Sequence, residues 1–581
     1  MGKFSPNVIA NCLVSCAKYN PDGELVVYGD RRITWGEMVD RSFRMANALI
    51  DLGIKKDDKI TFMFHNTPEF IETNFAIQAA GAVPVPMNYR FMPREIEFQA
   101  DHSDACVFIY DALFRDAVEK AAPNLSGIKT FIRYGEGELE ALNYEDFLKP
   151  GKNGDPRVSN DWEDVAVMIY TGGTTGFPKG VMLTYGGHRD MFANLLGNVL
   201  VRAADLDLSR ERRKKLAEAL PIPGLQYLHA AAQTSFFKKI IKADWTYKKL
   251  RDGLSYLLSH PQAARFGYSM TIPYMVPSFP FFHDASYQIL VLMALMGNIS
   301  FVLVPEVRFD PEKVLAAVEK EKPIFMANVP TGWKKLVNHP AVDKYNTSSI
   351  RIAATGAGAC PVSLKRKMFE KFPEIIIADM FGQTEMTPIT TFRLDMSPET
   401  LKERSVGKSI VDAKVVDETG EEVRQGEVGE IMYKSSTVMK GYYKDEDKTK
   451  EVMEGGWFRS GDLGYLDEEG EVRLIDRKKE CINTGGEKVF PLEVEEVLHE
   501  HPAVEDVAVI GVPDEEWGSA VRAVVQLKKG EEAGAEELQE FCRDKLAGYK
   551  IPRSVVFVAE LPLSPVGKVL RQKIRDMYGQ A

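Results

Sequence analysis

Cysteine is scarce in this chain, with six residues in a sequence of 581. The six are scattered and form no C-x-x-C pair. This argues against a zinc site and against a disulfide scaffold. A reducing cytoplasm is therefore the expected compartment.

Long apolar runs are missing as well. No stretch approaches the roughly 18 apolar residues of a membrane-spanning helix, and the first residues contain no apolar signal segment. Membrane contact is therefore expected to be peripheral at most. The net charge of −11 argues against nucleic acid as the main partner, since nucleic-acid-binding domains are usually basic.

The length and composition fit a multidomain globular protein. At ~100–200 residues per domain, 581 residues predict three to four compact units. Strand-like and helix-like segments alternate at 35–52, 59–64, 68–80, 82–86 and 105–110, and again from 300 to 380. This βαβα rhythm predicts a mostly parallel sheet with helices on both faces, an α/β fold.

The pattern of predicted elements changes after about residue 405. Short strands punctuated by glycine, at 430–433, 441–443 and 471–475, predict a small antiparallel β unit. A charged and exposed break, DRKKE, follows at 476–480. Helices at 492–501 and 536–546 and strands at 504–510 and 520–527 then predict a compact α+β domain.

The run YTGGTTGFPKGVM at 170–182 carries the strongest chemical signal. Glycines allow close backbone approach to a ligand, consecutive backbone N–H groups form an anion-binding concavity, and hydroxyls and a lysine add donors. The run follows a predicted buried strand at 165–170, so we interpret it as a triphosphate-binding loop. It is not a P-loop, because Phe177 and Pro178 separate Gly176 from Lys179 and Gly180 replaces the required Ser or Thr.

Further blocks occur downstream: TGAGA at 355–359, DMFGQTE at 379–385, WFRSGDLG at 457–464, DRKK at 476–479, GG at 485–486 and LPLSPVGKVLR at 561–571. With the 170–182 loop, their order resembles the adenylate-forming superfamily, which includes AMP-forming acyl-CoA synthetases. The resemblance covers about residues 34–571. It implies a large N-terminal domain at 1–475, made of two doubly wound α/β subdomains and a small distorted β-barrel at about 400–475. A hinge at 476–479 and a small mobile α+β C-terminal domain at 480–581 would follow.

The resemblance assigns phosphate and metal contacts. The phosphate-binding residues it implies are Thr171, Gly172, Gly173, Thr174, Thr175, Gly176, Lys179 and Thr384. Mg²⁺, which binds mainly through substrate phosphate and few carboxylates, would be held by Glu385 and Thr175.

It also assigns the nucleoside contacts. Those expected beside adenine are Gly356, Ala357, Gly358, Asp379, Met380, Phe381, Gly382 and Gln383, with Phe381 stacking on the ring. Asp462 would accept hydrogen bonds from both ribose hydroxyls, and Arg477 would contact ribose or phosphate.

The remaining roles concern catalysis and the acyl group. Lys568 would be the catalytic lysine, bridging the carboxylate and the α-phosphate, and Lys479 would mark the hinge. Gly485 and Gly486 would lie near the pantetheine of CoA. His283 and Ala359 would line the acyl pocket.

The activity implied is a two-step acid–thiol ligation that uses ATP, Mg²⁺ and coenzyme A. The expected acid is a fatty or aromatic monocarboxylate, because the predicted pocket residues are mostly small or apolar. An acyl-AMP ligase that serves a carrier protein shares most of these motifs. A nucleotide-binding protein without catalysis and a luciferase-type oxygenase are further alternatives with less support. A homodimer is compatible with this class.

One segment departs from the family pattern. His188 and His283 are 95 residues apart (283 − 188), more than is usual in the family, which indicates an insertion at about 200–275. Within 205–251, 11 Lys and Arg stand against 5 Asp and Glu. Three interpretations stay open: a packed elaboration or subunit interface, a wall of the acyl pocket, and a basic-aromatic surface for anionic membranes.

Overall fold

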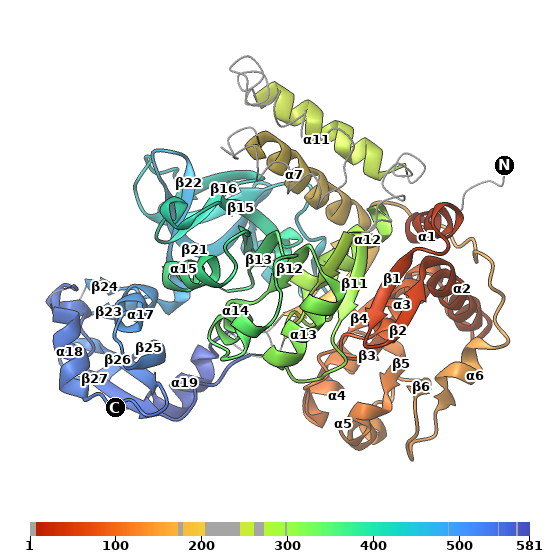
Figure 1. Ribbon diagram of the computed structural model, residues 1–581, viewed down its shortest axis with the longest axis horizontal. Coiled ribbons are helices and arrows are strands. Elements are labelled where there is room, and N and C mark those ends of the chain that lie inside the picture. Colours follow the sequence, from red (N-terminus) through yellow and green to blue (C-terminus); the bar gives the residue numbers. More distant parts are fainter. Residues whose placement is uncertain are drawn as a thin grey trace.

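The computed structural model describes residues 7–171, 178–203, 244–260, 272–296, 299–358, 360–485, 487–543, 545–564 and 568–580. Figure 1 shows a large N-terminal part, from red to cyan, and a smaller C-terminal part in blue. No helix in these ranges is long and apolar enough to cross a membrane.

The first unit is a parallel sheet with the strand order β4-β3-β5-β6-β7. Its strands are β3 (Lys59–Met63), β4 (Val83–Pro86), β5 (Ala105–Asp111), β6 (Thr130–Tyr134) and β7 (Leu142–Asn143). Its helices are α2 (Trp35–Asp51), α3 (Pro68–Ala79), α4 (Pro93–His102), α5 (Arg115–Ala121) and α6 (Tyr144–Leu148). Thr67 caps α3 by accepting from the Phe70 N–H, and Pro68 occupies the first turn, where its missing N–H costs nothing.

The second unit is one long sheet, ordered β17-β18-β21-β22-β16-β15-β14-β13-β12-β10-β11-β1-β2 with β20 on β21. Its central parallel strands are β10 (Ile272–Met275), β11 (Ile299–Leu303), β12 (Phe325–Asn328), β13 (Ile352–Thr355) and β14 (Ile376–Gly382), and β1 (Glu24–Tyr28) and β2 (Arg31–Thr34) form one edge. The predicted α/β architecture is thereby confirmed.

Helices cover both faces of this sheet. α13 (Pro311–Glu321), α14 (Pro330–Val337) and α15 (Val362–Lys371) pack against the face that carries Met326, Ala353 and Ile377. The opposite face, which carries Ala327 and Ala354, joins the cluster of α1 (Val8–Tyr19), α7 (Tyr185–Ala203) and α12 (Asp284–Met296). α11 (Asp244–Leu258) lies alongside α7 on this side (Figure 1).

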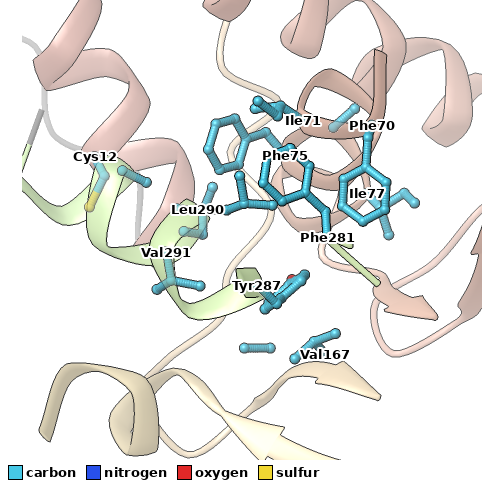
Figure 2. Packing of buried hydrophobic residues seen from close by; sticks show 14 of the residues in the cluster. Cys12, Phe70, Ile71, Phe75, Ile77, Val167, Phe281, Tyr287, Leu290 and Val291 are labelled. Atoms are coloured by element: carbon cyan, nitrogen blue, oxygen red, sulfur yellow. The ribbon is translucent and has the colours of Figure 1, made fainter. Parts of the chain in front are cut away.

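The largest buried cluster joins the two units. Figure 2 shows Phe70 and Phe75 of α3 close to Phe281 and to Leu290 of α12. The ring centroids of Phe70 and Phe281 are 5.5 Å apart. Burial of large aromatic side chains from both units stabilises their arrangement, because each removes a large apolar area from water.

The antiparallel unit predicted after residue 405 is present, but it is not a separate sheet. Its strands are β15 (Ile389–Asp395), β16 (Ser405–Ser409), β17 (Asp412–Val416), β18 (Gly429–Lys434), β20 (Met453–Glu454), β21 (Trp457–Leu466) and β22 (Glu471–Arg477), with α16 (Glu446–Val452) between them. β15 pairs with both β14 and β16, so hydrogen bonding runs on from the parallel sheet. A third sheet joins β8 (Val165–Thr171), β9 (Lys179–Thr184) and β19 (Gly441–Tyr442).

The C-terminal part has the predicted α+β character. Its elements are β23 (Ile482–Thr484), β24 (Glu487–Val489), α17 (Pro491–His499), β25 (Val504–Asp514), β26 (Gly518–Leu527), α18 (Ala535–Arg543), β27 (Ser554–Val558) and α19 (Arg571–Tyr578). Helix α18 ends before the predicted residue 546. Among the described residues, three ion pairs join this part to the N-terminal part: Lys334–Glu505 at 2.8 Å, Arg404–Glu496 at 2.6 Å and Lys488–Glu418 at 2.9 Å.

The charged run at 476–480 has partners in both parts of the chain. β22 continues through Arg477, and the Asp476 carboxylate accepts from the Leu492 N–H at 2.8 Å. Glu480 is buried and pairs with Arg575. Lys478 is exposed, as the composition predicts, and its Nζ lies 3.0 Å from Glu430 Oε2 of β18. The sequence pattern alone does not reveal these partners.

Candidate active site

A cleft of about 3740 Å³ lies at the carboxyl ends of β12–β14 and between the two parts of the chain. Ligand sites of open α/β sheets form at this edge, because the loops after the strands converge there. The predicted residues that line this cleft are Thr171, Lys179, His283, Gly356, Ala357, Gly358, Asp379, Met380, Phe381, Gly382, Gln383, Thr384, Glu385, Asp462, Arg477, Lys479 and Lys568.

The triphosphate loop is bounded by an antiparallel hairpin. Thr171 ends β8 and pairs with Lys179, which begins β9. Gly172, Gly173, Thr174, Thr175 and Gly176 lie outside the described residues, as do Ala359 and Gly486, so their predicted roles stay predictions.

Strand β19 brings a residue that the sequence interpretation missed. The hydroxyl of Tyr442 donates to Glu385 Oε1 at 2.7 Å, and Lys179 Nζ lies 4.9 Å from the centroid of the Tyr442 ring. Burial and the charge of Lys448 lower the pKa of Lys179. Tyr442 thus links the predicted metal ligand to the predicted pyrophosphate contact. The sequence predicted the strand at 441–443, but only the pairing of β19 with β9 places it here.

The predicted ribose site is a pair of adjacent strand residues. Asp462 on β21 faces Arg477 on β22 in register, and Arg477 Nε lies 2.6 Å from Asp462 Oδ1. Gln383 Nε2 donates to Asp462 Oδ2 at 2.5 Å and to the Ser460 carbonyl at 2.8 Å. Burial raises the pKa of Asp462 and Arg477 opposes that rise. The carboxylate is therefore fixed in orientation before a ligand arrives.

The predicted adenine segment turns sharply after β13. Ala357 has φ 61°, and a side chain on Gly356 would place its Cβ 2.7 Å from the Met380 carbonyl oxygen. The backbone of 356–358 therefore packs against β14 as closely as only glycine allows. Asn328 Nδ2 and Thr355 Oγ1 are buried at this strand edge without a hydrogen-bond partner in the structure.

Asp379, a predicted nucleotide contact that lines the cleft, also has a structural partner. Its carboxylate is buried, and Lys365 Nζ lies 2.6 Å from Asp379 Oδ2 and 3.1 Å from Asp395 Oδ2. Asp395 also pairs with Arg393 at 2.7 Å. Asp379 therefore anchors β14 to α15 through Lys365. No local sequence pattern predicts this network, because Lys365 lies in a helix that carries several other charged residues.

Lys365→Met should destabilise the protein by about 3–5 kcal/mol, because removing one partner leaves a buried charge uncompensated. Thermal unfolding should show a clearly lower midpoint than wild type. The matched control is Arg366→Met, one residue along on the exposed side of α15, which should leave the midpoint nearly unchanged. Equal midpoints for the two variants would contradict a stabilising role of this network.

Lys568 reaches the cleft from the C-terminal part. Its backbone N–H donates to Ser564 Oγ at 3.0 Å. The residue is exposed, and it lines the cleft. Desolvation and the charge of Arg477 lower the pKa of Lys568 to about 8, against the opposing effect of Asp462 and Glu385. These neighbours place the amine between the predicted ribose and metal positions.

His283 is half-buried and lines the same cleft as this lysine. Burial, with a smaller contribution from the charge of Lys568, lowers the pKa of His283 to about 3, so the ring is neutral at neutral pH. Behind it, His188 Nδ1 and Gln288 Oε1 are 2.7 Å apart, and Gln288 Nε2 donates to Asp284 Oδ1 at 2.6 Å. This buried polar chain ties α7 to the first turn of α12.

Lys479 lines the cleft, whereas Gly485 does not. Burial and the charge of Arg477 lower the pKa of Lys479. Gly485 has φ 60°, and a Cβ there would lie 2.4 Å from the Trp517 ring. Trp517, which the sequence interpretation missed, makes glycine necessary at this position. In this arrangement of the chain, the predicted pantetheine contact is thus separate from the nucleotide cleft.

Among the described residues, no group of three or more His, Cys, Asp or Glu could hold a metal by itself. A cation here would need other oxygens besides Glu385. Mg²⁺ commonly has such an environment, with one or two carboxylates and substrate phosphates.

Comparisons with known proteins agree with this geometry. The model of the AMP-binding enzyme family matches residues 14–220 and 257–443, and that of the AMP-binding enzyme C-terminal domain matches 493–568. A feruloyl-CoA synthase of Amycolatopsis sp is 30% identical over 565 residues, covering 97% of each chain. A long-chain-fatty-acid–CoA ligase of Bacillus subtilis is 30% identical over 602 residues, covering 98% of this chain and 95% of that one.

Solved structures share the fold. An anthranilate CoA ligase in complex with anthranoyl-AMP aligns with a TM-score of 0.79 at 23% identity, covering 99% of this chain and 98% of that one. A fatty acyl CoA synthetase of Mycobacterium tuberculosis aligns with a TM-score of 0.67 at 25% identity, covering 99% and 98%. The chain therefore belongs to the AMP-binding enzyme family, the predicted adenylate-forming group.

Proposed function

We propose that this protein is an AMP-forming acyl-CoA synthetase for an apolar monocarboxylic acid. The observation that carries the proposal is the meeting of Lys568 with Glu385 and Asp462 in one cleft. Adenylation of a carboxylate requires an amine beside the reacting groups, a carboxylate that can bind Mg²⁺ and a carboxylate that can bind ribose. Lys568, Glu385 and Asp462 are of these types.

In the first step, a carboxylate oxygen of the acid attacks the α-phosphorus of ATP. The bond from that phosphorus to the bridging oxygen of the β-phosphate breaks, and pyrophosphate leaves. Both reactants are anions, so positioned positive charge contributes most of the catalysis. Lys568 supplies that charge beside the carboxylate and the α-phosphate, and Lys179 supplies it beside the leaving pyrophosphate.

Mg²⁺ fits at Glu385, where it would neutralise phosphate charge when bound. Glu385 is held for this role by the hydroxyl of Tyr442. Asp462 orients the ribose hydroxyls, and the turn at 356–358 offers its backbone to adenine. The neutral His283 borders the acyl side without adding charge that would compete with Lys568 for the carboxylate.

In the second step, the thiol sulfur of CoA attacks the acyl carbonyl carbon. The bond to the phosphate oxygen breaks, AMP leaves, and the thiol proton passes to solvent. Because Gly485 lies away from the nucleotide cleft here, this step requires a rotation of the C-terminal part about Lys479. The present arrangement then corresponds to adenylation.

The test is a panel of carboxylic acids assayed for AMP release with ATP, Mg²⁺ and CoA. We expect fatty or aromatic acids to give AMP and the acyl-CoA thioester in equal amounts. Acyl-adenylate formation without CoA thioester, but with transfer to a carrier protein, would instead establish an acyl-AMP ligase. Tight ATP binding without pyrophosphate release for every acid would contradict an enzymatic role.

A further inference from the structure

An apolar compartment extends the cleft away from the nucleotide site. On the sheet face toward α7, Ala327, Ala354 and Ala378 stand side by side in register across β12, β13 and β14. Toward the amino ends of the same strands, Phe325, Ile352 and Ile376 form a second row in register. All six side chains line the cleft.

Opposite this sheet face, the compartment is bounded by α7 and α11. The apolar residues that these helices contribute to the lining are Phe192, Leu195, Leu196, Val199, Leu250 and Leu254. Leu250, Leu254 and Leu258 recur every four residues, so they share one face of α11. Leu258 is buried, while Leu250 and Leu254 are half-buried against the compartment. Lys248, Lys249 and Asp252 lie exposed on the other side of the helix.

Polar contacts fix α11 in this position. Ser255 Oγ of α11 donates to Asp190 Oδ1 of α7 at 2.8 Å, and Arg189 Nη1 donates to Ser259 Oγ at 3.2 Å. Asp190 Oδ2 also accepts from Ser436 Oγ at 2.7 Å. One carboxylate thus joins α7, α11 and the segment after β18. Specific hydrogen bonds therefore hold α11 in place as one wall of the compartment.

Most of α11 lies outside the residues that the family model matches. The match ends at residue 220 and resumes at 257, so Leu250 and Leu254 fall in the unmatched interval, as does Ser255. The family model therefore carries no information on this wall.

We propose that α11 sets the substrate specificity of this enzyme by forming the far wall of the acyl compartment, and that the substrate is a long, linear apolar monocarboxylate. This deepens the proposed function and rests on it. Within the compartment, the alanine row and the row of Phe325, Ile352 and Ile376 are two residue steps apart, about 7 Å at about 3.3 Å per residue. A linear alkyl chain covers that distance, whereas a single aromatic ring attached to its carboxylate does not.

The test places larger side chains on the face of α11 that lines the compartment. Leu250→Trp and Leu254→Trp should each lower kcat/KM for hexadecanoate about tenfold or more, because apolar contacts at the chain end are lost or obstructed. The kcat/KM for hexanoate should stay near the wild-type value, which also shows that the variants fold. The matched control is Leu257→Trp, on the same helix but with a side chain that is 41% exposed, and it should leave both values unchanged.

A second readout does not depend on turnover. Wild-type protein should bind cis-parinaric acid, an 18-carbon fluorescent polyene acid, and Leu250→Trp should weaken that binding while Leu257→Trp should not. Unchanged chain-length profiles and unchanged cis-parinaric acid binding in both α11 variants would overturn the proposal, as would a wild-type preference for hexanoate. If no acid gives pyrophosphate, the proposed function fails, and the fluorescence measurement alone then decides whether α11 borders an acyl-binding compartment.

Discussion

Lys568→Ala should lower pyrophosphate release from ATP and acid by about 10²–10³-fold, the usual cost of removing one preorganised charge from a transition state. The amine lines the same cleft as Asp462, Glu385 and Arg477, and their charges act on it. Transfer of a supplied acyl-adenylate to CoA should proceed at close to the wild-type rate, because in the proposed mechanism Lys568 leaves the cleft for that step.

The two half-reactions are measured separately, by pyrophosphate release and by thioester formation from synthetic acyl-adenylate. Lys529→Ala, an exposed lysine of the same domain, is the control and should affect neither. Equal loss of both half-reactions in Lys568→Ala would contradict this division of labour.

The pH profile of wild type gives a related check. Because the pKa of Lys568 is lowered to about 8, the charged amine is present below that pH and is lost as pH rises through it. The kcat/KM of adenylation, which reports the free enzyme, should therefore fall above pH about 8. Lys568→Arg keeps its charge and should move this descending limb to higher pH.

Glu385→Gln should lower adenylation by about 10²-fold and raise the Mg²⁺ concentration that half-saturates the rate. The substitution removes the charge of Glu385, the carboxylate that accepts the hydrogen bond from Tyr442. A neutral amide oxygen binds a hard dication such as Mg²⁺ more weakly than a carboxylate oxygen does. Tyr442→Phe should have a smaller effect, about tenfold, since it removes one hydrogen bond to a charged group.

Titration of the rate with Mg²⁺ distinguishes these outcomes. Glu446→Gln, an exposed carboxylate at the start of α16, should show the wild-type Mg²⁺ dependence. If Glu385→Gln shared that dependence, Glu385 would not be a metal ligand.

Much of the site could be predicted from the sequence because its residues lie in short contiguous blocks. DMFGQTE at 379–385 places Thr384 and Glu385 directly after a strand, and the WFRSGDLG block places Asp462 on β21. The phosphate loop could be predicted because its glycines and threonines suit a backbone that approaches a ligand closely. The role of each block could therefore be predicted with little information about the rest of the fold.

The parts that could not be predicted depend on long-range pairing. Tyr442 reaches Glu385 only because β19 pairs with β9, more than 250 residues earlier in the chain (442 − 181). The Lys365–Asp379–Asp395 network joins a helix to two strands, and a charged helix gives no local sign of burial. The run at 476–480 is partly covered for the same reason, because Asp476 and Glu480 have partners in α17 and α19 and Lys478 has one in β18.

The sequence also left the role of the 205–251 segment open. Only its last part, residues 244–251, is described, and there α11 packs on α7. That placement favours the interpretation as a wall of the acyl pocket. Peripheral membrane contact through the segment, a homodimer and a cytoplasmic location stay predictions.

The three ion pairs between the two parts of the chain have a thermodynamic consequence. Lys334–Glu505, Arg404–Glu496 and Lys488–Glu418 all contain partly exposed side chains, and such pairs contribute about 0.2–1 kcal/mol each. Together they favour the present arrangement by only about 0.6–3 kcal/mol, roughly a 3–150-fold difference in population. Ionic strength screens such pairs, so salt alone should redistribute the enzyme between the two arrangements that the proposed mechanism requires.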